Sequence, residues 1–141
     1  MKIKTMNFGE IEVKNEDIIT FEEGIPGFEN LTEFVIIKDE DMVFSFLQSI
    51  QEDVTLILIN PFLVNKEYEF EINETTMKKL NINSHEDLSI YTVVTIPEDI
   101  KQMRTNLQAP IIINNKERKG RQIILDENYP LRYNIFKKVG A

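Results

Sequence analysis

The chain has 141 residues, 42% of them apolar, and a net charge of −8 from 16 Lys and Arg against 24 Asp and Glu. Its length suits one domain with its own core, and no segment approaches the roughly 20 consecutive apolar residues of a membrane span, so we expect a soluble protein without a membrane partner. The acidic balance disfavours direct nucleic-acid binding and is explained either by plain solubility or by attraction of a basic protein partner, while the absence of cysteine excludes disulfides, thiolate metal sites and Cys nucleophiles.

The N-terminal half has the pattern of short strands. Residues 2–6 and 10–14 alternate between polar and apolar types around Asn-Phe-Gly, which predicts a hairpin with Gly9 at positive φ. This segment lacks the continuous apolar stretch of a signal peptide, so we expect a cytoplasmic protein. Further strands are predicted at residues 18–21, 33–38, 42–49, 54–59 and 67–72.

The C-terminal half continues this pattern after one short helix. Asn73 is suited to cap that helix, and Met77 and Leu80 give it an apolar stripe. Strands follow at residues 88–97, 110–114 and 121–125. About ten short strands with one or two short helices predict a mainly β, small antiparallel barrel-like fold in a single domain over residues 1–141, because closure removes exposed sheet edges.

The segment "EEGIPGFEN" concentrates residues that control backbone geometry. Pro26 and Gly27 suit the two central positions of a type II turn, and Gly24 frees the approach to it. Ile25 and Phe28 are then held at the corners of a stiff turn, where their side chains lose little entropy on contact. Two interpretations stay open: these side chains bind another protein, or they plug one end of the barrel.

A second stiff corner is predicted in "NLQAPIIIN". Pro110 begins a strand, where a missing N–H does least harm, and Asn106 can satisfy backbone groups in the bend. A purely structural role of these residues explains much of this pattern. Asn106, Ala109 and Pro110 are nevertheless candidates for protein binding, beside the first corner if the strands close a barrel.

The segment "EYEFEI" has the clearest alternation in the chain. As a strand it directs its apolar side chains inward and Glu67, Glu69 and Glu71 outward along one face. Three like charges in a row either protect a sheet edge against unwanted pairing or attract a basic partner. The three glutamates are therefore candidates for protein binding.

No motif indicates catalysis, a metal or a cofactor. The single histidine, His85, lies in the polar segment "NSHEDL" and is predicted at the surface. The paired carboxylates lack the spacing of a calcium loop, and no glycine-rich phosphate loop is present. We therefore expect no enzyme, no cofactor and no metal site.

The chain resembles the FliW family of flagellar assembly factors. The resemblance rests on "ITFEEGIPGFE", "FSFLQS", "LINPF" and "NLQAPIIINNKERKGRQIIL", whose order and spacing agree over essentially the whole chain. It implies a barrel-like cytoplasmic adaptor without catalytic activity that binds monomeric flagellin. It further implies binding to CsrA, an RNA-binding regulator whose repression of flagellin translation the adaptor relieves.

The mechanism that the resemblance implies is partner switching. Accumulating flagellin captures the adaptor, and released CsrA then stops flagellin synthesis. CsrA must be basic where it holds RNA phosphates, which agrees with an acidic counterpart. The C-terminal segment "LRYNIFKKVGA" is basic and apolar, so no CsrA contact is assigned to the last ten residues.

Two other classes of protein remain as alternatives. An enzyme using carboxylates such as Glu22 and Glu23 predicts a deep polar pocket around them. A ligand-binding β-barrel predicts an apolar lumen large enough for a small molecule.

Overall fold

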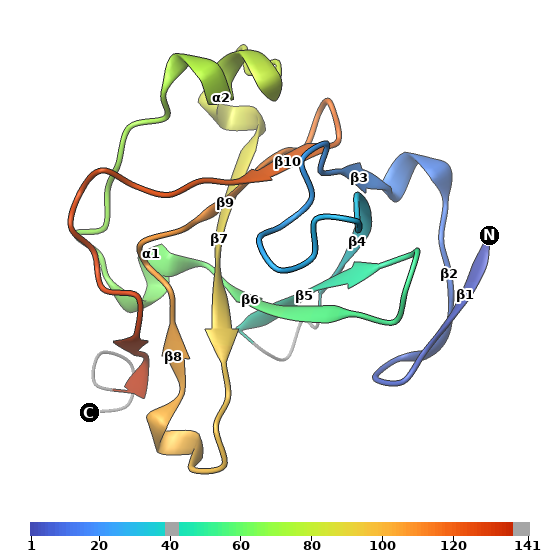
Figure 1. Cartoon of the computed structure of the whole chain (residues 1–141), viewed down its shortest axis with the longest axis horizontal. Helices are drawn as coiled ribbons and strands as arrows, with labels where there is room; N and C mark the ends of the chain where they lie inside the picture. Colours follow the sequence, from blue (N-terminus) through green and yellow to red (C-terminus); the bar gives the residue numbers. More distant parts are fainter. Residues whose placement is uncertain (39–42, 137–141) are drawn as a thin grey trace.

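The computed structural model describes residues 1–38 and 43–136, so that Met42, predicted to begin a strand, lies outside the described residues. Two short helices, α1 (Pro61–Val64) and α2 (Glu74–Lys79), accompany the strands (Figure 1). The strands are β1 (Lys2–Thr5), β2 (Gly9–Glu12), β3 (Ile19–Thr20), β4 (Glu33–Lys38), β5 (Phe44–Ser49), β6 (Thr55–Ile59), β7 (Leu88–Thr95), β8 (Arg104–Thr105), β9 (Ile111–Asn114), β10 (Lys119–Gln122) and β11 (Tyr133–Asn134). Within the described ranges no helix combines the length and apolar character needed to span a bilayer.

Seven strands close into a barrel, which confirms the predicted fold class. They pair in the order β7, β6, β5, β4, β3, β10 and β9, and β9 returns to pair with β7. An odd number of strands cannot alternate in direction around a closed ring, so one neighbouring pair must be parallel. That pair is β10 and β3, while the other pairings in the described residues are antiparallel.

The barrel interior is filled by apolar side chains. Every member of the interior cluster is at most 4% exposed: Ile19, Phe21, Ile25, Leu31, Phe34, Leu47, Leu58, Ile111 and Ile113. A second cluster includes Ile112 of β9 and Leu80, the residue that follows α2. β9 thus buries both of its faces, which explains the uninterrupted apolar run "III".

The segment from Glu67 to Ile72 is not a strand, which corrects the prediction. Its burial still alternates: Tyr68 is buried, while the glutamates on either side are exposed. The Tyr68 hydroxyl donates to the Leu107 carbonyl at 2.7 Å, and the Glu69 backbone exchanges hydrogen bonds with the Tyr129 hydroxyl. An extended chain lying on an apolar surface alternates in this way without any strand beside it. The three glutamates therefore protect no edge of a sheet.

Side-chain caps begin both helices. The Asn73 side chain accepts a hydrogen bond from Thr76 N at 2.8 Å, which confirms the predicted cap of α2. Asn60 both follows β6 and caps α1, accepting from Phe62 N at 3.0 Å. The predicted strand at residues 121–125 is observed two residues earlier, as β10, although Ile123 and Leu125 still donate backbone hydrogen bonds to residues 110 and 108.

Candidate functional site

The turn at residues 24–28 has the predicted type II geometry. Gly27 has φ of +90°, and the Phe28 N–H donates to the Ile25 carbonyl at 2.6 Å. Gly24 has φ of +69°, and a Cβ placed on it would lie 2.5 Å from the Glu29 carbonyl oxygen. Both glycines are therefore required by the backbone path rather than by any partner.

The two corner side chains of this turn point in different directions. Ile25 is 3% exposed and belongs to the interior cluster, as the barrel-plug interpretation expects. Phe28 is 38% exposed and lines a surface groove. The turn therefore buries one corner side chain and leaves the other partly exposed, which suits the binding interpretation for Phe28 better than the plug interpretation.

The second corner is built by side-chain to backbone hydrogen bonds. Asn106 Oδ1 accepts from Gln108 N at 2.9 Å, as expected for a residue that satisfies the bend. Gln122 Nε2 donates to the Ala109 carbonyl at 3.0 Å and ties the corner to β10. Pro110 is buried and begins the path into β9.

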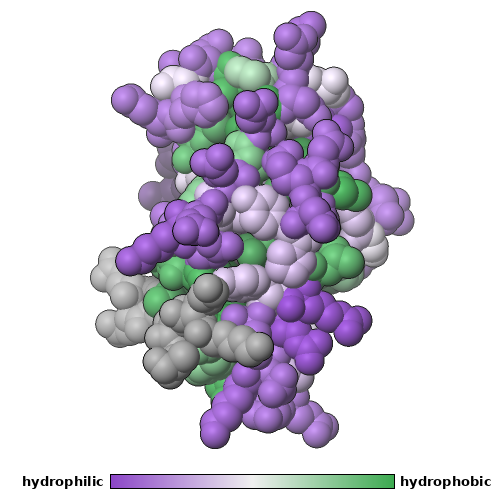
Figure 2. Space-filling view, turned by 90° about the vertical axis from the view of Figure 1, so that its left-hand side faces the viewer, coloured by the Kyte–Doolittle hydropathy of each residue, from purple (hydrophilic) through white to green (hydrophobic). Residues whose placement is uncertain are grey.

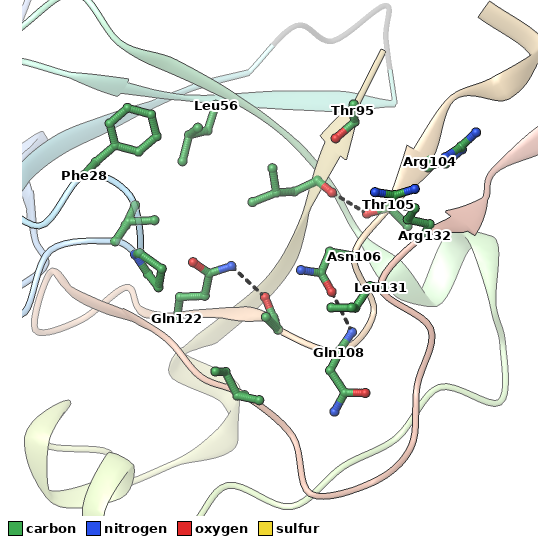
Figure 3. Close-up of a pocket in the computed structure, with 15 residues that line it drawn as sticks. Phe28, Leu56, Thr95, Arg104, Thr105, Asn106, Gln108, Gln122, Leu131 and Arg132 are labelled. Carbon is green, nitrogen blue, oxygen red and sulfur yellow. Dashed lines mark hydrogen bonds between the residues drawn. The ribbon is translucent and has the colours of Figure 1, made fainter. Parts of the chain in front are cut away.

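Both corners line the same hollow, which we call the mouth groove, and it borders the interior cluster through Ile25, Leu56 and Val93. Its volume is about 830 Å³. Figure 3 places Phe28 and Leu56 at one end and Arg104 and Arg132 at the other. Of the candidate residues, the mouth groove is lined by Ile25, Pro26, Phe28, Asn106 and Ala109, whereas Gly24, Gly27 and Pro110 do not line it.

Ten of the fifteen lining residues were not anticipated from the sequence, and four of these are arginines or strongly exposed apolar residues. Ile124 and Leu131 are 76% and 64% exposed at the groove, and the other two are the arginines at its far end. Ile124 lies between the buried Ile123 and Leu125, so in a period-two pattern it is an apolar residue on the outward face. An apolar residue on the outward face of a predicted strand was thus the signal in the sequence that could have identified Ile124 as a surface contact. Nothing local to the arginines marks them.

A second hollow, the acidic groove, lies under the glutamate segment. Its volume is about 470 Å³, and Glu69 and Glu71 line it but Glu67 does not. Its other lining residues are Phe62, Phe70, Ile72, Met77, His85, Leu88 and Ile90. Burial raises the pKa of the neighbouring Tyr68 phenol, so this hydroxyl stays protonated and holds its hydrogen bond to Leu107.

The two grooves use opposite faces of β7. Leu88 and Ile90 line the acidic groove, whereas Val93 and Thr95 line the mouth groove. Side chains along a strand alternate between faces, so even-numbered and odd-numbered positions of β7 point apart. The grooves share no lining residue.

Glu22 and Glu23 do not form the polar pocket that the enzyme alternative requires. They border a hollow of about 10 Å³, too small for a substrate. Glu23 accepts a hydrogen bond from Lys79 and lies 3.5 Å from Arg121. The Lys79 hydrogen bond, followed by the Arg121 charge, lowers the pKa of this carboxyl, so that it stays ionised and is a weaker base than an ordinary glutamate.

No metal site is evident in the described part of the chain. No three His, Asp or Glu side chains in residues 1–38 and 43–136 are placed to share a metal ion. The interior cluster of the described residues is packed, so the space that could take a small molecule is the mouth groove and not a lumen inside the barrel. Figure 2, which shows the left-hand side of Figure 1, has apolar surface emerging in several places between hydrophilic side chains.

Comparison with known proteins identifies the family. The sequence profile of the FliW protein family matches residues 2–135. The chain belongs to the FliW family. It is 48% identical over 141 residues to the flagellar assembly factor FliW of Caldicellulosiruptor saccharolyticus, covering 99% of this chain and 93% of the relative. The corresponding protein of Clostridium tetani is 43% identical over 141 residues, covering 98% and 97%.

The fold agrees with that of a solved family member. The crystal structure of the flagellar assembly factor FliW superposes with a TM-score of 0.91 at 35% identity, covering 96% of each chain. The chain is therefore a flagellar assembly factor with the barrel of its family.

Proposed function

We propose that this flagellar assembly factor is a non-enzymatic cytoplasmic adaptor that binds monomeric flagellin through the mouth groove. The observation that carries the proposal is the convergence of two stiff corners on one open groove with a partly exposed aromatic ring, Phe28. Backbone hydrogen bonds and the buried Ile25 hold that ring in place before any partner arrives. A preorganised aromatic anchor is typical of the residues that dominate protein interfaces.

We further propose that the acidic groove binds CsrA. It joins an apolar floor to two exposed carboxylates, Glu69 and Glu71, with Glu67 nearby on the same segment. A regulator that holds RNA phosphates presents the opposite charge. Because the two grooves share no lining residue, partner switching then requires that flagellin in the mouth groove weaken CsrA binding at the other face of β7, so that the released CsrA represses flagellin translation.

Binding should distinguish monomeric from assembled flagellin. We expect a one-to-one complex with the monomer and little retention on filaments, because a cytoplasmic adaptor uses flagellin surface that assembly buries. Size-exclusion chromatography with light scattering measures the stoichiometry of the complex with the monomer, and co-sedimentation with sheared filaments measures retention on the filament. Equal retention on filament and monomer contradicts the proposal.

The three glutamates should act mainly on the rate of CsrA association. Changing Glu67, Glu69 and Glu71 together to glutamine should slow association severalfold at low salt and flatten its salt dependence, since steering acts through a field screened over about 8 Å at physiological ionic strength. Dissociation and flagellin binding should change little. Stopped-flow or surface-plasmon measurements at several salt concentrations give both rates.

A matched control separates steering by the acidic groove from loss of net charge. The variant E16Q/E52Q/E98Q removes three exposed carboxylates that line neither groove. Its rate of association with CsrA should be closer to that of the unmodified protein than the rate of the variant changed at Glu67, Glu69 and Glu71. If both triple variants behave alike, the glutamate segment has no specific role.

A further inference from the structure

The far end of the mouth groove is positively charged, although the chain carries a net charge of −8. Arg104 and Arg132 both line this end, and no Asp or Glu lines the groove. In the antiparallel register of β8 and β11, Arg104 lies opposite Asn134. Continuing that register places Arg132 opposite Asn106, on the same face and diagonal to Arg104.

Neither guanidinium group is neutralised within the described part of the chain. The four ion pairs found there involve other residues, and no hydrogen bond of either arginine side chain is present. Two like charges on neighbouring positions of one face repel each other. This arrangement suits an anionic group supplied from outside, since a planar guanidinium binds a carboxylate through two parallel hydrogen bonds.

We propose that the mouth groove recognises an acidic amphipathic segment of flagellin, with one or two carboxylates paired to Arg104 and Arg132. Apolar side chains of the same segment lie against Phe28, Leu56, Ile124 and Leu131. The apolar end supplies affinity, and the two arginines fix the direction of the segment and select against neutral or basic apolar sequences. This inference rests on the proposed binding of flagellin to the mouth groove.

The test compares two double variants of the full chain. R104Q/R132Q removes the two charges in the groove, and K78Q/K116Q removes two exposed positive charges that line neither groove. Calorimetric titration with monomeric flagellin should show a dissociation constant raised roughly tenfold or more for R104Q/R132Q, because the charge-assisted hydrogen bonds to the carboxylates are lost. The affinity of K78Q/K116Q should stay within about twofold of the unmodified chain.

A second arm tests the chemistry of the partner. Overlapping synthetic peptides that cover flagellin are titrated by fluorescence anisotropy, and the tightest binder is remade with Asn and Gln in place of Asp and Glu. The amide peptide should bind the unmodified chain roughly tenfold more weakly, yet bind R104Q/R132Q no more weakly than the acidic peptide does. Such a coupled loss identifies the carboxylate to arginine contact itself.

The outcomes separate this inference from the proposed function. Failure of the unmodified chain to bind monomeric flagellin contradicts the proposed function. Flagellin binding that survives unchanged in R104Q/R132Q overturns only the assignment of the arginines. Self-association that R104Q/R132Q abolishes while flagellin binding stays intact would assign the groove to a second copy of the chain and likewise overturn the inference.

Discussion

Replacing Phe28 by alanine is expected to weaken flagellin binding about thirtyfold or more while leaving the fold intact. The ring is 38% exposed on a turn whose backbone hydrogen bond does not depend on it. Truncating a hot-spot aromatic side chain costs at least about 2 kcal/mol of binding free energy. Calorimetry gives the affinity, and thermal or urea unfolding of the same sample gives the stability, which should fall by no more than about 1–2 kcal/mol.

Ile25→Ala is the matched control for this prediction. The side chain belongs to the same turn but is 3% exposed within the interior cluster, so the variant should lose about 2–5 kcal/mol of unfolding free energy. Its affinity per folded molecule should change much less than that of the Phe28 variant. If Phe28→Ala instead lowers the melting temperature and keeps its affinity, Phe28 supports the fold and is not an interface residue.

Gly24→Ala should destabilise the protein by roughly 2–5 kcal/mol. Two effects contribute: left-handed backbone strain of about 1–2 kcal/mol, and overpacking of about 1–3 kcal/mol. The added Cβ would lie 2.5 Å from the Glu29 carbonyl oxygen and 2.6 Å from its Cα, and backbone atoms cannot rotate away as a side chain can. Urea unfolding measures the loss, and flagellin affinity should fall as well because the same turn carries Phe28.

Gly9→Ala separates the two contributions. Gly9 has φ of +67°, close to the +69° of Gly24, but no atom lies within 4 Å of the position its Cβ would take. Its substitution should therefore cost only the backbone strain of about 1–2 kcal/mol. Equal losses for the two variants would contradict the steric role assigned to Gly24.

Features set by a few neighbouring residues were predictable from the sequence. The type II turn follows from Pro26 and Gly27, whose allowed φ values leave few alternatives, and the cap of α2 follows from one side chain, Asn73. The barrel class follows from repeated period-two alternation, because many short strands must either close or leave edges exposed. The resemblance to the FliW family was also recognisable from the sequence, since it depends only on the order and spacing of motifs.

The tertiary structure decided what depends on distant partners. Alternation at residues 67–72 predicts which side chains are buried, but whether the backbone joins a sheet depends on what lies beside it, and here Tyr129 supplies a hydroxyl in place of a strand. One turn buries Ile25 and exposes Phe28 because the barrel wall meets only one of its corners. Arg104 and Arg132 are 28 positions apart, and only the pairing of β8 with β11 places them at one end of a groove. Composition and periodicity describe the chain one segment at a time, whereas a binding surface forms from segments that meet only after the barrel has closed.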